Sequence, residues 1–167
     1  MRARALMTAP VATCHPSDSL DHAAHLMWEH DYGAIPVVDE HGALVGIVTD
    51  RDIAMAAYTR GQALRSISVS TAMAEVVFSV DAEASLEEVE ELMRAKQVRR
   101  IPVIEDGGKP GAKPIGMISL NDIARHANDG KRTASTDRKL VETMAEICSP
   151  RRRKAKPQEV PEARVNA

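Results

Sequence analysis

The chain has 167 residues, a length that predicts about one domain. Hydrophobic residues make up 44% of it and charged residues 28%, a composition that is typical of globular proteins and excludes a disordered or fibrous chain. One Trp, two Tyr and one Phe are too few for the row of aromatic platforms on which single-stranded nucleic acids stack. The net charge of −2 combines an acidic body with a basic segment from residue 150 onward, which holds six basic and two acidic residues. We therefore do not expect nucleic acid as a partner of the body.

Targeting signals are missing from the sequence. No apolar run approaches the roughly 18–20 residues needed to cross a bilayer. The basic N-terminus is not followed by the apolar segment of a signal peptide. Cys14 and Cys148 are too few cysteines for the disulfide framework of a small secreted domain. We therefore expect a cytoplasmic protein without a membrane partner.

The predicted elements form two copies of one pattern. The first copy has an extended piece at residues 11–14, a helix with an apolar face from Leu20, strands at 35–38 and 44–48, and a helix at 50–58. The second copy has an extended piece at 76–80, a helix from Leu86, strands at 101–104 and 115–118, and a helix at 120–127. Ile35-Pro36-Val37-Val38 recurs 66 residues later as Ile101-Pro102-Val103-Ile104, and Gly46-Ile47-Val48-Thr49 recurs 70 residues later as Gly116-Met117-Ile118-Ser119.

Each copy has about 60 residues, which is marginal for independent stability. We therefore expect one α+β domain in which two β-α-β-β-α repeats, residues 6–66 and 67–128, pack through their sheets with pseudo-two-fold symmetry. Residues 129–148 are expected to form a linker and an added helix, with an apolar stripe of Leu140, Val141, Met144 and Ile147. Prolines and charges without apolar periodicity predict a disordered basic tail at residues 149–167.

Two strings in each copy are distinctive: Gly33-Ala34-Ile35-Pro36-Val37-Val38-Asp39 with Gly46-Ile47-Val48-Thr49-Asp50-Arg51-Asp52-Ile53, and Arg99-Arg100-Ile101-Pro102-Val103-Ile104 with Gly116-Met117-Ile118-Ser119-Leu120-Asn121-Asp122-Ile123. They resemble the CBS domain, and the tandem resembles a Bateman module. Three strings are also similar to the stand-alone bacterial CBS-pair proteins known as hypoxic response proteins, which are induced in dormancy or oxygen stress: Gln97-Val98-Arg99-Arg100-Ile101-Pro102-Val103, Asp122-Ile123-Ala124-Arg125-His126 and Ile147-Cys148-Ser149-Pro150. The resemblance implies a homodimeric regulatory module that binds an adenine nucleotide, AMP or ATP, and acts on a regulated protein.

Thr49 and Asp52, like Ser119 and Asp122, follow an apolar strand and open a helix. One interpretation is a capping box, in which the hydroxyl and the acid satisfy backbone groups at the start of the helix. In the CBS domains that the sequence resembles, the matching residues hold a nucleotide ribose, and a carboxylate is able to accept two hydrogen bonds from a vicinal diol. Both interpretations remain open, and two sites are conceivable.

Arg99 and Arg100 stand at the position where phosphate-binding CBS domains carry basic residues, and a guanidinium suits bidentate contact with phosphate. The first copy has Gly33 and Ala34 at this position, which lack charge but let a purine approach the backbone. Arg51 is a further candidate cation. The alternative interpretation is that these arginines form ion pairs with the acidic body.

Cys14 and Cys148 lack the spacing of a zinc signature. If the added helix packs against the first strand, they could form a disulfide or part of a zinc site; otherwise a buried cysteine is an inert small hydrophobe. The sequence contains no nucleophile-base-acid set, Walker loop or GxGxxG turn, so we predict no enzymatic activity.

Three functional hypotheses follow. The first is a non-catalytic sensor that binds an adenine nucleotide between its two repeats. The alternative is a metal- or disulfide-stabilised stress protein that binds no nucleotide. The third is an adaptor whose basic run, Arg151-Arg152-Arg153-Lys154-Ala155-Lys156, attracts an acidic partner.

Overall fold

The structure is a computed structural model that describes residues 1–105, 107, 109, 111–128 and 134–149. Its helices are α1 (Ala3–Leu6), α2 (Leu20–His30), α3 (Asp50–Arg60), α4 (Leu86–Lys96), α5 (Leu120–Asn128) and α6 (Ala134–Cys148), with 3-10 turns at Leu64–Ser66 and Val69–Thr71. Its strands are β1 (Ala34–Val38), β2 (Leu44–Thr49), β3 (Val80–Asp81), β4 (Arg100–Ile104) and β5 (Pro114–Ser119). The mixed α+β class is confirmed, and the order helix-strand-strand-helix occurs in both copies, whereas the leading strand of the predicted repeat forms only in the second. Helix α1 and the two 3-10 turns were not predicted.

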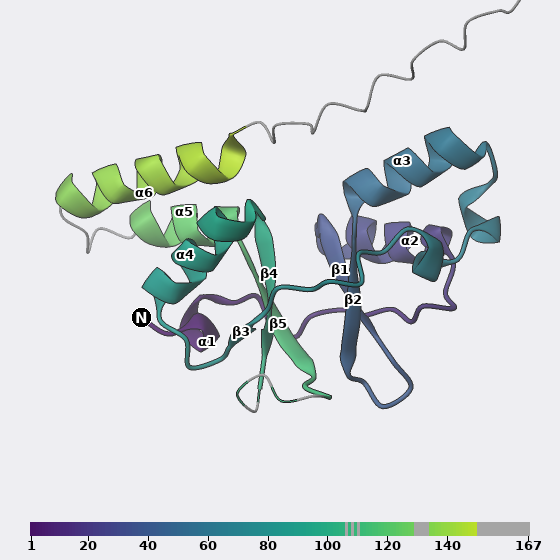
Figure 1. Ribbon diagram of the computed structural model, residues 1–167, viewed down its shortest axis with the longest axis horizontal. Coiled ribbons are helices and arrows are strands. Elements are labelled where there is room, and N and C mark those ends of the chain that lie inside the picture. Colours follow the sequence, from purple (N-terminus) through teal and green to yellow (C-terminus); the bar gives the residue numbers. More distant parts are fainter. Residues whose placement is uncertain (106, 108, 110, 129–133, 150–167) are drawn as a thin grey trace, which may run out of the picture.

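Two hairpins form the centre of the molecule (Figure 1). Strands β1 and β2 pair antiparallel as a two-stranded sheet, and β4 pairs antiparallel with β5 and parallel with β3. Helices α2 and α3 lie beyond the first hairpin, and α4, α5 and α6 lie beyond the second. The hairpins meet directly, because the Leu44 N–H donates to the carbonyl oxygen of Ala112 at 3.0 Å.

The first extended piece is shorter than predicted. In place of a strand at residues 11–14, only Cys14 bridges to Val37. The piece expected at 76–80 is also shorter, since only Val80 of it lies in β3, which extends to Asp81. The two copies differ two residues after the equivalent bridging residues Cys14 and Val80. There the Ala82 N–H donates to the carbonyl oxygen of Ile104 at 2.9 Å, but the first copy has Pro16, which has no N–H to extend the pairing.

Each half is completed by the segment that precedes the other half in the chain. Residues 1–8 pack on the second half, where the Leu86 N–H donates to the carbonyl oxygen of Met1 at 3.1 Å. Residues 67–74 pack on the first half, where the Leu20 N–H donates to the carbonyl oxygen of Ile67 at 2.8 Å. Because these pairs are related by the 66-residue offset, the exchange obeys the pseudo-two-fold symmetry of the sequence. The expected repeat boundaries, 6–66 and 67–128, follow the sequence similarity between the two copies. The contacts made by residues 1–8 and 67–74 join one copy to the other.

In each of these two segments, a methionine side chain packs against a glycine in a strand of the half that receives the segment. The Met7 side chain lies on Gly116 of β5, and Met73 lies on Gly46 of β2. A Cβ atom at Gly116 would collide with the Met7 sulfur and stand 3.0 Å from the carbonyl oxygen of Thr8. Each glycine therefore leaves the space that the segment from the other repeat occupies.

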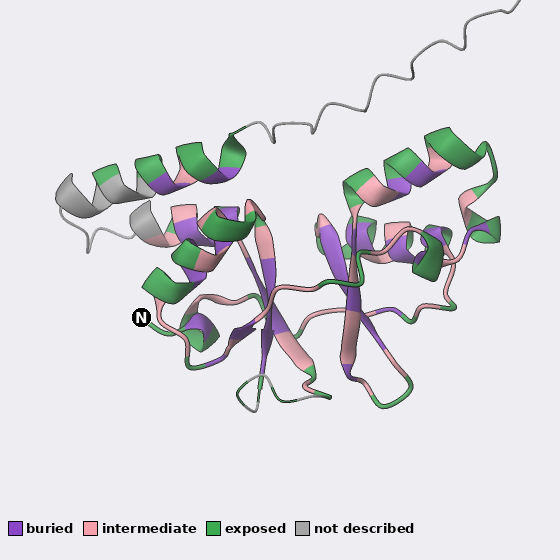
Figure 2. Cartoon of the chain, viewed as in Figure 1, coloured by how far each residue is buried: buried purple, intermediate pink, exposed green. Residues whose placement is uncertain are grey.

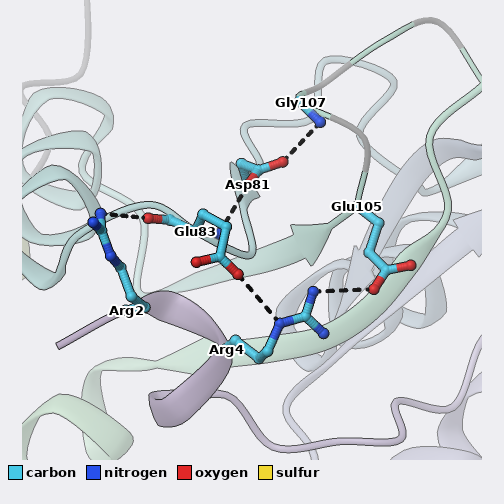
Figure 3. A network of polar contacts seen from close by, with 6 residues as sticks. All are labelled: Arg2, Arg4, Asp81, Glu83, Glu105 and Gly107. Atoms are coloured by element: carbon cyan, nitrogen blue, oxygen red, sulfur yellow. Dashed lines mark hydrogen bonds and ion pairs between the residues drawn. The ribbon is translucent and has the colours of Figure 1, made fainter.

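Charged groups hold α1 on the second half (Figure 3). The Arg4 guanidinium lies 3.4 Å from the carboxylate of Glu83 and 3.1 Å from that of Glu105. Beside them, the Asp81 carboxylate accepts hydrogen bonds from the backbone N–H groups of Glu83 at 2.8 Å and Gly107 at 2.7 Å. These backbone donors lower the pKa of Asp81, so its carboxylate is ionised at neutral pH.

Each half has its own apolar core, and the outer helix faces are exposed (Figure 2). Buried Leu20, Ile35, Val37, Val48 and Val69 belong to the first core, and buried Ala3, Met93, Ile101, Ile118 and Ile123 belong to the second. The exchanged residues Val69 and Ala3 are each fully buried in the half that receives them.

The apolar stripe of the added helix differs from the prediction. In α6, Ile147 is 2% exposed and Met144 packs on the second core, but Val141 is 64% exposed and Thr143 is buried in its place. At 3.6 residues per turn, positions 143, 144 and 147 share one face of a helix and position 141 does not. The Leu140 side chain lies outside the described residues, as does the tail from residue 150. In the part of the chain that the structure describes, no helix has the length and apolarity needed to span a membrane.

We predict that Gly116→Ala lowers the free energy of unfolding by about 1–3 kcal/mol, because the added methyl group pushes Met7 and Thr8 off β5. Urea denaturation of Gly116→Ala, Met7→Ala and the double variant measures this effect as a double-mutant cycle. The strain is partly relieved once Met7 is truncated, so the two substitutions should be less costly together than their sum. Strict additivity would contradict the contact.

Candidate functional site

The predicted site residues gather at one end of the two hairpins. Strand β2 ends at Thr49, which pairs with Ala34 at the start of β1, and β5 ends at Ser119, which pairs with Arg100 at the start of β4. Helices α3 and α5 begin immediately after these strand ends. The pseudo-two-fold symmetry therefore places two equivalent strand-to-helix junctions at the same end of the hairpins.

Each junction carries a hydroxyl and a carboxylate in contact. The Asp52 Oδ2 atom accepts hydrogen bonds from the backbone N–H of Thr49 at 2.9 Å and from its hydroxyl at 2.6 Å. The Asp122 Oδ2 atom accepts the same two bonds from Ser119, at 2.7 and 2.5 Å. We call Thr49 with Asp52 the first cradle, and Ser119 with Asp122 the second cradle.

The capping interpretation is borne out by the geometry of both cradles. The Thr49 hydroxyl accepts the Asp52 N–H at 3.2 Å, and the box formed by Ser85 and Glu88 at the start of α4 has the same arrangement. Capping engages only one oxygen of each acid, Oδ2. The Oδ1 atom of Asp52 has no hydrogen-bond partner among the described residues, which leaves it as an acceptor.

Arg100 reaches from the second half to the first. Its Nη2 atom lies 3.9 Å from Oδ2 of Asp50, which is the first residue of α3 and adjoins Thr49. A Cβ atom at Gly33 would collide with the Arg100 guanidinium, so the glycine leaves the space that the side chain fills. The carbonyl oxygen of Gly33 also accepts the Asp50 N–H at 3.3 Å. Gly33, Asp50 and Arg100 thus form one contact between the halves beside the first cradle.

The side chains of the remaining predicted site residues take no part in the contacts of the two cradles. Arg99 and Arg51 are exposed, and neither side chain forms an ion pair within the described residues. The backbone of Arg51 donates to Asp50 Oδ1 at 2.7 Å. Ala34 is buried in β1, where it supplies no polar group. The ion-pair interpretation of the arginines therefore applies to Arg100, through Asp50.

Two charged residues near the cradles were missed by the sequence analysis. Asp50 is found only through the contact with Arg100, which joins residues 50 positions apart. Arg125 forms an ion pair with Oδ1 of Asp122. The i, i+3 spacing of Asp122 and Arg125 on a predicted helix was a usable signal for this second pair.

Cys14 and Cys148 are both free thiols and belong to different halves of the structure, so a shared disulfide or zinc site stays a prediction. Cys14 is buried in the first core, whereas Cys148 is exposed at the end of α6, which packs on α4 and α5. Burial, with a smaller contribution from the Asp18 carboxylate, raises the pKa of the Cys14 thiol to about 12. Within residues 1–105, 107, 109, 111–128 and 134–149, no group of three or more His, Cys, Asp and Glu side chains could hold a metal ion.

Two surface hollows lie outside the cradles. One, of about 470 Å³, is lined by Ala24, Met27, Trp28, Asp31, Tyr32, Asp50 and Ile53. The other, of about 490 Å³, is lined by Arg4, Asp81, Ala82, Glu83, Glu105 and Gly107. Neither is lined by a cradle residue, although the first shares Asp50 with the Arg100 contact.

Solved structures share the overall fold of this chain. The crystal structure described as Hypoxic Response Protein I with two coordinated zinc ions has a TM-score of 0.65 and 34% identity, and the match covers 75% of this chain and 98% of that chain. The CBS domain pair of protein MJ0100, in complex with 5′-methylthioadenosine and S-adenosyl-L-methionine, has a TM-score of 0.69 and 26% identity, over 78% and 98% of the two chains. CBSX2 in complex with AMP has a TM-score of 0.64 and 27% identity, over 78% and 98%.

The sequence comparisons agree with the structures. Hypoxic response protein 1 of Mycobacterium tuberculosis is 32% identical over 148 residues, which cover 89% of this chain and 94% of that protein. The CBS domain family matches the chain twice, at residues 3–58 and 67–129. These two matches include both hairpins and both cradles, and the chain therefore belongs to the CBS domain family as a tandem pair.

Proposed function

We propose that the chain is a non-catalytic regulatory module that binds an adenine nucleotide in the cleft between its two repeats. The observation that carries the proposal is the placement of Arg100, a cation from the second half, beside the first cradle. The proposal is supported by the solved CBS pairs, since CBSX2 was crystallised with AMP and the MJ0100 pair with two adenosyl compounds.

The chemistry of the first cradle suits a ribose and a phosphate. Oδ1 of Asp52 accepts the hydroxyl groups of a ribose diol while Oδ2 remains engaged in the helix cap. The Arg100 guanidinium then turns from Asp50 to the phosphate. This exchange costs little, because the Asp50 side chain is 64% exposed and its separation from Arg100 is 3.9 Å. A ligand held by both halves favours one packing of the repeats, and this is how binding acts on a partner.

We predict that Asp52→Asn weakens nucleotide binding by about 10- to 100-fold, since a hydrogen bond to a charged group contributes about 1.5–3 kcal/mol. The asparagine retains a carbonyl oxygen for the cap and presents an amide to the ribose in place of an acceptor. Isothermal titration calorimetry with AMP, ATP, NAD and S-adenosylmethionine measures the change. Glu88→Gln is the matched control, because it alters an equivalent capping box that lies at the start of α4.

Absence of binding heat from all four compounds to the unmodified protein would contradict the proposal. Equal loss of affinity in Asp52→Asn and Glu88→Gln would also contradict it, because capping alone would then explain the effect.

A second candidate function is a zinc- or disulfide-stabilised stress protein, which the zinc-containing crystal structure of Hypoxic Response Protein I favours. Cys14 and Cys148 do not lie together in one chain, so this candidate requires zinc ligands or a disulfide partner from elsewhere. We propose that expression under hypoxia or other stress is shared with that relative and does not depend on bound metal.

We predict that thiol titration of the native protein with Ellman's reagent detects Cys148 rapidly and Cys14 only after unfolding. Cys14 is buried and its raised pKa keeps the thiol protonated at pH 8, whereas Cys148 is exposed. Cys148→Ser, which removes the exposed thiol alone, is the control. A native protein with no reactive thiol, or with stoichiometric zinc by elemental analysis, would favour the second candidate.

We further propose that the outer face of α2 and α3 binds a second copy of this chain. In the second half, α6 covers the equivalent helices α4 and α5, and the Nε atom of Arg94 is buried there. The residue 66 positions earlier is Trp28, which is 87% exposed. Tyr58 is 82% exposed and Met55 48% on the adjacent α3. The first half therefore presents aromatic side chains where the second half is covered by a helix.

Charge favours a copy of the same face as the occupant. Glu29 in the last turn of α2 and Asp31 at its C-cap are exposed, and α3 exposes Arg51 and Arg60. A two-fold axis that places α2 of one chain against α3 of the other brings opposite charges together around the aromatic residues.

We predict that Trp28→Glu or Tyr58→Glu weakens self-association by about 30-fold or more, as expected when a central aromatic of an interface is lost. Sedimentation velocity over a concentration series measures the dimer constant. Val141→Glu is the control, because Val141 is exposed on α6, outside this face. A protein that is monomeric throughout, or equally affected by all three variants, would contradict the proposal.

The remaining expectations stay predictions. A regulated partner follows from a module without catalysis, and a cytoplasmic location is the simplest setting for nucleotide sensing. The basic run of the third hypothesis lies outside the described residues.

A further inference from the structure

We infer that only the first cradle accepts a ribose, and that Arg125 closes the second cradle. This inference rests on the proposed nucleotide function and names the residue that determines which of two similar sites is used. It depends on one difference between the two cradles, which the internal repeat otherwise makes alike: the partner of the Oδ1 atom of the acid.

The hydrogen bonds to the Oδ2 atom of the acid are the same in the two cradles. In both, Oδ2 of the acid accepts a backbone N–H and a hydroxyl hydrogen from the residue that caps the helix. Ligand binding at either cradle therefore depends on the outer oxygen, Oδ1, which capping does not use.

The outer oxygens differ. Oδ1 of Asp122 is paired with the Arg125 guanidinium, one turn further along α5. The residue 70 positions earlier, which follows Asp52 by the same three positions, is Met55. A thioether donates no hydrogen bond, so Oδ1 of Asp52 remains an open acceptor.

The pair in the second cradle resists replacement by a ribose. The Asp122 side chain is only 9% exposed, so its carboxylate depends on the partners that the fold provides. The pair joins two opposite charges, whereas the hydroxyl groups of a ribose are neutral donors. A diol that displaced Arg125 would leave the nearly buried Asp122 carboxylate without its counter-ion.

The residue that each cradle faces in the other repeat also favours a ligand at the first cradle. Across from the first cradle stands Arg100, which is able to neutralise a phosphate. The symmetry-related position across from the second cradle is Ala34, which carries no charge. The same cradle therefore has both the open carboxylate oxygen and the cation from the other repeat.

The test is the stoichiometry of AMP binding, measured by isothermal titration calorimetry on the full chain. We expect one AMP per chain for the unmodified protein and two for Arg125→Met, which reproduces the residue of the first repeat. Arg125 is 75% exposed, so the substitution should leave the fold intact. Arg138→Met is the matched control, because it removes another exposed arginine that pairs with an acid on its own helix, Glu142.

Acid variants assign the sites. Asp52→Asn should weaken the single site of the unmodified protein by about 10- to 100-fold and leave one unweakened AMP site per chain in the Arg125→Met background, whereas Asp122→Asn should leave the single site of the unmodified protein intact. A stoichiometry of one that Arg125→Met does not change, or loss of that site in Asp122→Asn, would overturn the inference while nucleotide binding itself stands. No binding of AMP, ATP, NAD or S-adenosylmethionine to any of these proteins would overturn the proposed function instead.

Discussion

The exchange of the segments at residues 1–8 and 67–74 is the contact on which the rest of the molecule depends. Each segment supplies backbone hydrogen bonds and buried side chains to the half that it does not precede. A half of about 60 residues is marginal for independent stability. Because each half is completed by a segment from the other, the two must be packed together, and the ends of their hairpins are held at one place.

This constraint explains why the candidate site lies between the repeats. The first cradle belongs to the junction of β2 and α3, but the cation beside it, Arg100, begins β4 of the other half. Gly33 leaves the space that brings the guanidinium across. A ligand that touches both the cradle and Arg100 senses the packing of the halves, which is the physical basis of a regulatory response.

The symmetry of the backbone is not matched by the side chains, and the differences give the two halves separate roles. Arg125 occupies the second cradle where Met55 leaves the first one open. Helix α6 covers α4 and α5, whereas Trp28 and Tyr58 remain exposed on α2 and α3. These differences underlie our proposals that the first half binds the ligand and a second copy of the chain, with Arg100 of the second half as the cation.

The sequence by itself determined the repeated order of elements, the cradles and their caps, because apolar periodicity and short-range hydrogen bonds act within a few residues. It failed at the strand of residues 11–14, where Pro16 ends the pairing, and at Val141, where helix geometry favours Thr143. The Asp122–Arg125 pair lies within one helix and was predictable in principle. Only the tertiary structure decided that residues 1–8 complete the second half, that Cys14 and Cys148 lie apart, and that Arg100 reaches Gly33 and Asp50. These contacts join residues far apart in the chain, and their positions are set by how the two halves pack.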